Sequence, residues 1–504
     1  MNHIVIAPVL APLVAGVLLL LLRAGDFERR RVLSVAMVAL QVLLALWLVQ
    51  MTAGGEILVY ALGNWPAPFG IVLVADRLAA WMLLTTGLLA FFALLSAVGG
   101  VDRAGRHFHV LFQFQLLGLN GAFLTGDLFN LFVFFEILLL ASYGLILHGG
   151  GRLRVRASLH YVVLNLVGST LFLFAVGALY GVLGTLNMAD LAVKAAAAAP
   201  EHVSIVRAAG LLLFGVFALK AALVPLYLWL PAAYANTSAP VAALFAIMTK
   251  VGAYAIVRMY TLVFGAEAGP VANLIEPWLL PLALITLVLG TLGAIASRSL
   301  RQQTAYLVVA SVGSLMTAVG LDNEAGLAAA FYYLPHTTFA AAAMFLLADT
   351  IATRRGALGD QFEQAPAIAQ HALIGALFFS IAVVVSGLPP LSGFVGKFLT
   401  LRAAIDHAAW AWVFAVVLSA GLLTVIALAR SGSLLFFRTR PLEVDETPPP
   451  GVTDAHLLIP AVGLLALCLA MTIGAGVIHQ HAEAIATQLS SPSAYIQAVL
   501  GGQL

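Results

Sequence analysis

The chain has 504 residues, of which 62% are hydrophobic and 9% charged, with a formal net charge of +2. A soluble globular domain carries roughly 25% charged residues, so this composition excludes an ordinary soluble enzyme and indicates a protein embedded in lipid. The single cysteine, Cys468, speaks against disulfides, thiolate metal sites and iron–sulfur ligation. Neither a phosphate-binding glycine loop nor a zinc-ligand spacing occurs. We therefore predict no cofactor and no metal site.

Apolar runs of about 20 residues, the length that crosses ~30 Å of hydrocarbon, recur from end to end of the chain. Backbone polar groups in lipid must find their hydrogen bonds within the segment, so each run is expected to form a helix. The prediction is an all-α polytopic membrane protein with about fourteen transmembrane helices. The predicted spans are 4–22, 32–52, 72–99, 108–126, 128–147, 159–183, 208–231, 238–263, 275–296, 303–321, 327–352, 372–402, 410–437 and 456–478.

Most arginines fall in alternate connections between these runs, which fixes an expected orientation. Loops rich in arginine and lysine face the cytoplasm, so both termini are predicted on the periplasmic or exterior side of a bacterial inner membrane. The opposite side holds little more than Arg77, Lys194, Arg207, Arg258 and Arg402. The predicted cytoplasmic residues are Arg23, Arg29, Arg30, Arg31, Arg103, Arg106, Arg152, Arg154, Arg156, Arg298, Arg301, Arg354, Arg355, Arg438 and Arg440.

Two of the apolar runs are interrupted by proline beside a lysine. Lys220 precedes Pro225 in KAALVPLYLWLP, whereas Pro389 and Pro390 precede Lys397 in SGLPPLSGFVGK. Proline removes a helical donor and clashes with the preceding turn. The two helices are predicted to run in opposite directions, so reversing one brings lysine and break into the same order. That pattern is typical of inverted repeats with discontinuous helices, although an ordinary proline kink would explain either break alone.

The matched breaks suggest a division of the chain into two five-helix inverted repeats with flanking segments. Of the longer connections, the one from Asn187 to Pro200 suggests a short interfacial helix. The Pro-rich connection at 438–455 is expected to be a flexible loop. The predicted units are an N-terminal three-helix segment at 1–107, a first repeat at 108–263, a second repeat at 264–437, and a loop with the last helix at 438–504.

Charged residues inside the apolar runs are the candidate functional groups. The chain has four lysines, and all but Lys194 lie within such runs, as Lys220, Lys250 and Lys397. Glu136 is the one carboxylate deep in an apolar run. Each such charge costs roughly 2.5–3.5 kcal/mol at the middle of the membrane, and the usual reason for keeping it is a path for protons or ions.

We expect Glu136 and Lys220 to be partners, because both lie near mid-membrane in neighbouring helices. Pairing holds the lysine proton, and separation in a dry environment releases it. His336, the one histidine deep in a predicted span, suits proton relay. With Lys250 and Lys397 these residues predict a polar line across the membrane centre, with water joining its members. The alternatives are a neutral packing carboxyl, a lysine that reaches the interface and a histidine bonded between helices.

Four segments carry a resemblance to a known family. The segments GDLFNLFVFFEILLLASYGL, LYGVLGTLNMADLA, KAALVPLYLWLPAAYANTSAPVAALFAIMTKVGAYAIVR and SGLPPLSGFVGKFLTLRAA resemble the proton-translocating antiporter family. It includes the large subunits of Mrp-type cation/proton antiporters and the antiporter-like subunits of respiratory complex I. The resemblance is closest to the D subunit of Mrp antiporters, and it implies a fourteen-helix fold and a proton path through Glu136, Lys220, Lys250 and Lys397.

Two functions fit these residues. The first is a membrane subunit of a multisubunit antiporter that exchanges protons for a monovalent cation, with sodium expected first. It would be a transporter component and not an enzyme, with other membrane subunits as partners. The second is a proton-pumping subunit of a complex I-type or hydrogenase-type redox complex. A structural scaffold with vestigial charges is disfavoured, because the four charged residues are all present.

Overall fold

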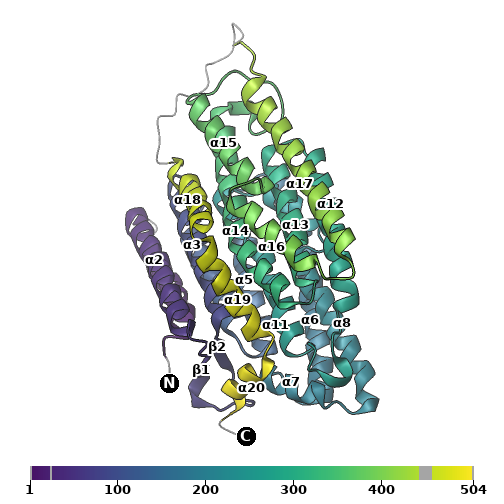
Figure 1. Ribbon diagram of the computed structural model, residues 1–504. Helices are drawn as coiled ribbons and strands as arrows, with labels where there is room; N and C mark the ends of the chain where they lie inside the picture. The colour runs from purple at the N-terminus through teal and green to yellow at the C-terminus, as the bar shows by residue number, and fades with distance from the viewer. Residues whose placement is uncertain (1–2, 23–24, 442–456, 502–504) are drawn as a thin grey trace.

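The computed structural model describes residues 3–22, 25–441 and 457–501, and it is a bundle of long helices packed side by side (Figure 1). Both termini lie at the lower end of the bundle in Figure 1. An even number of crossings, as predicted, would bring them to the same end. The first six helices are α1 (Ala7–Leu21), α2 (Phe27–Thr52), α3 (Arg77–Val98), α4 (Phe108–Leu124), α5 (Leu128–Leu147) and α6 (Arg152–Leu183).

The middle of the chain holds the predicted short helix, α7, and the first broken helix. At the start of α7, the side chain of Asn187 accepts hydrogen bonds from two backbone amides of the first turn. The seventh predicted span is divided into α8 and α9 by a break at 222–228 that contains Pro225. The elements are α7 (Met188–Ala196), α8 (Pro200–Ala221), α9 (Trp229–Asn236), α10 (Ala239–Phe245), α11 (Met248–Leu262), α12 (Glu276–Ala296) and α13 (Leu300–Val319).

The last third of the chain contains the second break, at 387–391, where Pro389 and Pro390 separate α15 from α16. Both interruptions predicted from proline are therefore confirmed. The elements are α14 (Glu324–Arg354), α15 (His371–Ser386), α16 (Ser392–Ala404), α17 (Trp410–Gly432), α18 (Ile459–Ile473), α19 (Ala475–Leu489) and α20 (Pro492–Leu500). Most of the predicted loop at 438–455 lies outside the described residues.

Within the described residues, nine helices are long and apolar enough to cross a membrane, or ten if the bent pair α18 and α19 counts as one span. The shorter apolar helices α1, α4 and α15 fall on further predicted spans. The polytopic helical fold is thus confirmed, whereas the number fourteen stays a prediction.

The structure corrects two of the predicted spans. The run at 72–99 begins as a strand, β2 (Val72–Ala75), which pairs antiparallel with β1 (Leu58–Ala61) before α3 starts. A buried apolar strand has no alternating pattern, so its residues read as part of the following helix. The run at 456–478 extends over a bend of 82° between α18 and α19, at Gly474.

The centre of the bundle is formed by α10, α11 and α14. The apolar stretch of α10 and α11 is 100% buried and that of α14 is 94% buried, against 28% for α2 at the periphery. At the lower end of Figure 1, α20 packs against α7 and β1. The most central helices are also the ones that carry Lys250 and His336, so these two groups lie in the protein interior, away from lipid.

Candidate functional site

The five titratable residues expected at mid-membrane lie on five different helices, and each has a polar partner on a neighbouring element. Lys220, Lys250 and His336 are buried, whereas Glu136 and Lys397 are half-buried. We call these five residues the central row. Interhelical hydrogen bonds of this kind offset part of the cost of placing polar groups in a membrane.

Glu136 and Lys220 are linked through α6 and do not form a direct ion pair within the described residues. The hydroxyl of Ser169 donates to the Glu136 carboxylate. The Lys220 ammonium donates to Asn165 Oδ1 at 3.0 Å. Because Asn165 and Ser169 are four residues apart, they lie on one face of α6. The predicted partnership of Glu136 and Lys220 is therefore indirect, with two neutral side chains between the charges.

The break after Lys220 is held by hydrogen bonds from outside the helix. Ala222, directly after α8, takes the left-handed conformation with a φ of 60°. The indole of Trp229 donates to the Leu219 carbonyl at 3.1 Å, and the Val224 amide donates to the Thr286 hydroxyl at 3.0 Å. Broken backbone at membrane depth is tolerated where such partners exist, so the protein stabilises the interruption beside the lysine.

Lys250 is fully buried and lies next to the end of α8. Its ammonium donates to the Ser311 hydroxyl of α13 at 3.4 Å. Gly252 lets the two backbones meet, since a Cβ there would lie 2.4 Å from the Ala221 amide nitrogen. This close approach of α11 to α8 brings the chain around Lys250 against the chain around Lys220.

His336 and Lys397 share a small cavity in the second half of the chain. His336 Nδ1 lies 2.9 Å from the Ser392 hydroxyl, and the Lys397 ammonium donates to the Ser386 carbonyl at 2.7 Å. The cavity they line, together with Ser311, has a volume of about 40 Å³. Roughly 10–15 Å³ suffices for one water, so this space is large enough for two or three. The cavity therefore connects Ser311, the hydrogen-bond partner of Lys250, with His336 and Lys397.

Sequence reasoning missed the neutral members of this arrangement. Asn165, Ser169, Ser311 and Ser392 position the charged groups, yet serine and asparagine are common in membrane helices. The available signal was spacing, because Asn165 and Ser169 are four residues apart in the apolar run VVLNLVGST. No such local pattern marks Ser311 or Ser392.

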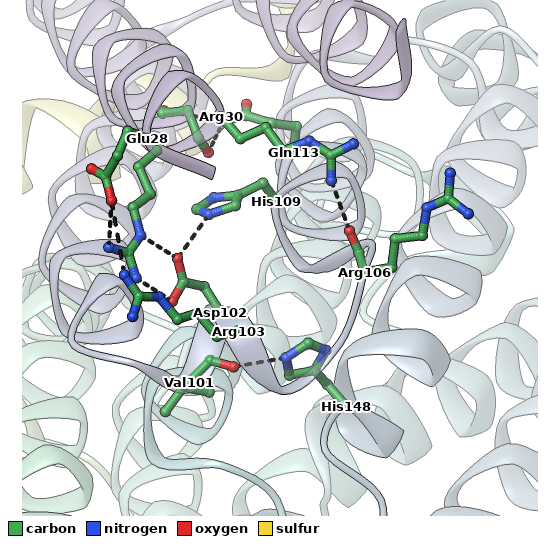
Figure 2. A network of polar contacts seen from close by, with 11 residues as sticks. Glu28, Arg30, Val101, Asp102, Arg103, Arg106, His109, Gln113 and His148 are labelled. Atoms are coloured by element: carbon green, nitrogen blue, oxygen red, sulfur yellow. Dashed lines mark hydrogen bonds and ion pairs between the residues drawn. The ribbon is translucent and has the colours of Figure 1, made fainter. Parts of the chain in front are cut away.

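A second polar cluster lies at the arginine-bearing end of the bundle and is drawn in Figure 2. Arg31 donates to both carboxylate oxygens of Asp102, at 2.7 and 2.8 Å, and His109 Nε2 lies 3.2 Å from the same carboxylate. Burial opposes ionisation of Asp102, but the hydrogen bonds and charges of Arg31 and His109 outweigh it and lower the Asp102 pKa to about 2. This cluster ties α2 to the connection between α3 and α4.

A third polar contact is buried near the opposite end. Arg258 of α11 forms a bidentate pair with Asp76, at 2.6 and 2.8 Å, and both side chains are at least 95% buried. The Asp76 carboxylate also accepts from the Ala79 amide and so caps α3. From the sequence, Arg258 is one of the few basic residues predicted on the outer side of the membrane. The structure shows it buried, because its partner comes from a residue 182 positions away.

Comparison with known proteins shows which family has this sequence and this architecture. The family described as NADH:quinone oxidoreductase/Mrp antiporter, transmembrane, matches residues 125–424. The D subunit of a probable K⁺/H⁺ antiporter of Rhizobium meliloti is 40% identical, with 99% of this chain and 98% of the relative covered. The D subunit of a Na⁺/H⁺ antiporter of Alkalihalophilus pseudofirmus is 37% identical over 99% of this chain and 100% of the relative. A chain in the structure of the Mrp complex from Dietzia has a TM-score of 0.87 at 30% identity, and the match covers 99% of this chain and 100% of that one.

A polytopic bundle with two broken helices and buried lysines is the architecture of an ion-transport membrane subunit. The chain belongs to the NADH:quinone oxidoreductase/Mrp antiporter family. Within that family its similarity is to the D subunits of Mrp-type antiporters, which confirms the resemblance found in the sequence.

Proposed function

We propose that this chain is the proton-carrying subunit of a multisubunit monovalent cation/proton antiporter, and that protons move along the central row. The observation that carries the proposal is that every member of the central row has a polar partner on a neighbouring element. Ser169 and Asn165, four residues apart on α6, contact Glu136 and Lys220 respectively. Ser311, which contacts Lys250, lines a water-sized cavity together with His336 and Lys397. The antiporter names of the relatives support the same function.

In this proposal the link between Glu136 and Lys220 is the switch. A proton that arrives at Glu136 removes the negative charge that favours the ammonium form of Lys220, so the lysine releases its proton toward Lys250. Asn165 holds the lysine on the α6 side through one neutral hydrogen bond. Such a bond contributes roughly 1 kcal/mol, so it positions the lysine and leaves it free to move.

We further propose that residues 108–263 and 264–437 form two inverted repeats and that the membrane is crossed fourteen times. The two lysine-bearing breaks support this. Lys220 lies two residues before the left-handed Ala222, and the Lys397 side chain lies over Gly387, which has a φ of 73°. A Cβ on Gly387 would approach Lys397 Cδ to 2.8 Å. In both broken helices the lysine therefore lies against the break.

The test is exchange in membrane vesicles that contain this chain and its partner subunits. Glu136→Ala and Lys220→Ala are expected to abolish cation-dependent proton movement while the complex still assembles, and Lys397→Ala should do the same. Lys250→Ala should slow transport. Lys194→Ala is the matched control, because Lys194 forms a half-exposed pair with Asp190 on α7, apart from the central row. Normal exchange by Glu136→Ala or Lys220→Ala would contradict the switch.

His336→Ala tests the middle of the central row separately. If His336 passes protons between Lys250 and Lys397, its removal should lower the exchange rate with assembly intact. Exchange at the wild-type rate would remove His336 from the path and leave the cavity water to connect the two lysines.

The transported cation and the wider complex need a second experiment. The two relatives are named for K⁺ and for Na⁺, so exchange should be measured with Na⁺, K⁺ and Li⁺ in turn. The family also includes NADH:quinone oxidoreductase subunits, and a redox-linked pump is the second candidate. Co-purification of small membrane subunits alone would favour the antiporter, and co-purified iron–sulfur proteins would favour the redox complex.

A further inference from the structure

A large cavity at the arginine-bearing end of the bundle is separate from the central row. It has a volume of about 800 Å³, against about 40 Å³ for the cavity beside His336. It lies between the first turns of α6 and α13, and α9 forms one of its walls. Pockets that bind small molecules have volumes of roughly 300–1,000 Å³, so this one is large enough for a ligand.

The charge of this cavity is strongly positive. Four arginines line it, Arg152, Arg154, Arg298 and Arg301, against one carboxylate, Asp360. Asp360 lies 3.7 Å from Arg301 and also accepts a hydrogen bond from the Arg301 amide at 2.7 Å. The one negative charge in the lining is thus already engaged.

The other three arginines form no ion pair with any carboxylate among the described residues. Arg154 donates to two backbone carbonyls, those of Asn236 and His148. Within the part of the chain that the structure describes, no carboxylate lies within 4 Å of Arg152, Arg154 or Arg298. Arginine presents a planar array of donors that fits phosphate oxygens, and these three arginines line the same cavity.

Part of the cavity wall is apolar, formed by Leu153 and by Leu228, Pro231, Ala232 and Ala235 of the α9 region, and the rest carries neutral polar side chains such as Gln302 and Gln361. Leu153 and Leu228, which both line it, have 70% and 67% of their surfaces exposed. Leu228 lies at the start of α9 and Asn236 at its end, so the lining extends roughly 12 Å along the helix at 1.5 Å per residue. Arg154 lies at the Asn236 end of this path, where it donates to the Asn236 carbonyl, and the exposed Leu228 lies at the other end. A free phosphate ion would use only the basic end.

We propose that this cavity binds an anionic phospholipid, with the phosphate on the arginines and an acyl chain along α9. Basic pockets between helices on the cytoplasmic side are suited to acidic lipid headgroups. The apolar wall distinguishes a lipid from a soluble anion, because it gives the acyl chain a surface to cover. The lipid would then lie against α9, the second half of a broken helix of the central row.

The test uses the full chain in nanodiscs that contain a trace of photoactivatable phosphatidylglycerol. Cross-linked peptides should come from 150–156 and 228–236, and unlabelled phosphatidylglycerol should compete. The double variant Arg152→Gln, Arg298→Gln should weaken binding roughly 25-fold, at about fivefold for each arginine. Both side chains are exposed, so folding should be retained. Arg29→Gln with Arg106→Gln is the matched control, with the same charge change at two exposed arginines outside the cavity lining.

Three results would overturn the proposal. The first is equal cross-linking in the cavity variant and the control variant. The second is full competition by inorganic phosphate or by zwitterionic phosphatidylethanolamine, which would indicate a soluble anion or an unspecific surface. The third is occupation of the same peptides by an acidic segment of a co-purified protein in place of lipid.

Discussion

At the scale of single residues, neutral side chains decide how the buried charges behave. Lys220 and Lys250 donate to an asparagine and a serine, and Glu136 accepts from a serine. A lysine in a direct ion pair would hold its proton more firmly than Lys220 and Lys250 do in these contacts, because a charged partner stabilises the charged form. Neutral partners lower the cost of burial without fixing the protonation state, which suits groups that have to exchange protons.

Asn165→Leu tests this reading of α6. The Lys220 ammonium would lose its oxygen acceptor, and a lost buried hydrogen bond costs roughly 1–3 kcal/mol. We expect the exchange rate in vesicles to fall about tenfold while assembly is retained. Thr170→Val, on the exposed side of the same helix, is the control and should exchange normally. An unaltered rate in Asn165→Leu would contradict a positioning role.

Asp102 gives a prediction for acid stability. Its pKa in the folded protein is about 2, against 3.8 as the ordinary value. A lowered pKa contributes stability above the ordinary value, and the contribution is lost as the pH falls through the folded value. The expected loss is about 2 kcal/mol between pH 4 and pH 2. Thermal unfolding in detergent would measure it, and Asp102→Asn should be less stable at pH 7 and lack this pH dependence.

At the scale of elements, the broken helices depend on close backbone contact. Gly252 lets α11 approach α8 at the residue after Lys220, and Gly393 lets α16 approach His336, where a Cβ would lie 3.0 Å from the imidazole ring and 2.3 Å from the Val384 carbonyl oxygen. The lengths of the helices give no hint of these contacts. These close backbone contacts at Gly252 and Gly393 set the spacing between members of the central row.

Gly252→Ala should separate α8 from α11. Overpacking of this kind costs roughly 1–3 kcal/mol, so we expect a lower unfolding temperature in detergent and slower exchange. Gly215→Ala, on α8 itself, is the matched control, since a Cβ there meets nothing within 4 Å. If both variants unfold at the wild-type temperature, the close approach does not constrain the fold.

At the scale of the whole molecule, buried charge pairs join parts of the chain that are distant in sequence. The pair of Asp76 and Arg258 connects the start of α3 with α11, and Arg258 also lies over the ring of Tyr495 in α20. The N-terminal segment, the first predicted repeat and the C-terminal helix therefore meet at one guanidinium. Near the other end, the pair of Arg31 and Asp102 joins α2 to the connection after α3.

Arg258→Met tests the buried pair. Removing one partner leaves the Asp76 carboxylate buried and unpaired, which costs roughly 3–5 kcal/mol. The double variant Asp76→Asn, Arg258→Met removes both charges and keeps an acceptor for the α3 cap, so it should recover more than half of the lost stability. Thermal unfolding in detergent measures both. A double variant no more stable than the single one would show that the loss comes from packing and not from charge.

The sequence by itself determined the class of protein and the identity of its buried charges. Length and apolar composition specify membrane helices, because lipid leaves the backbone no other way to satisfy its polar groups. Proline identified both breaks, and the high cost of buried charge singled out Glu136 and the three lysines. These features act locally along the chain, so they can be read from it.

Only the tertiary structure decided what those charges contact. Asn165 and Ser169 stand between Glu136 and Lys220, and Ser311 reaches Lys250 from 61 positions away. The sequence predicts on which side of the membrane Arg258 lies, but its buried partner Asp76 is visible only in the structure. Hydrogen-bond partners on different helices are set by how the helices pack, and packing depends on distances in space that no local pattern encodes.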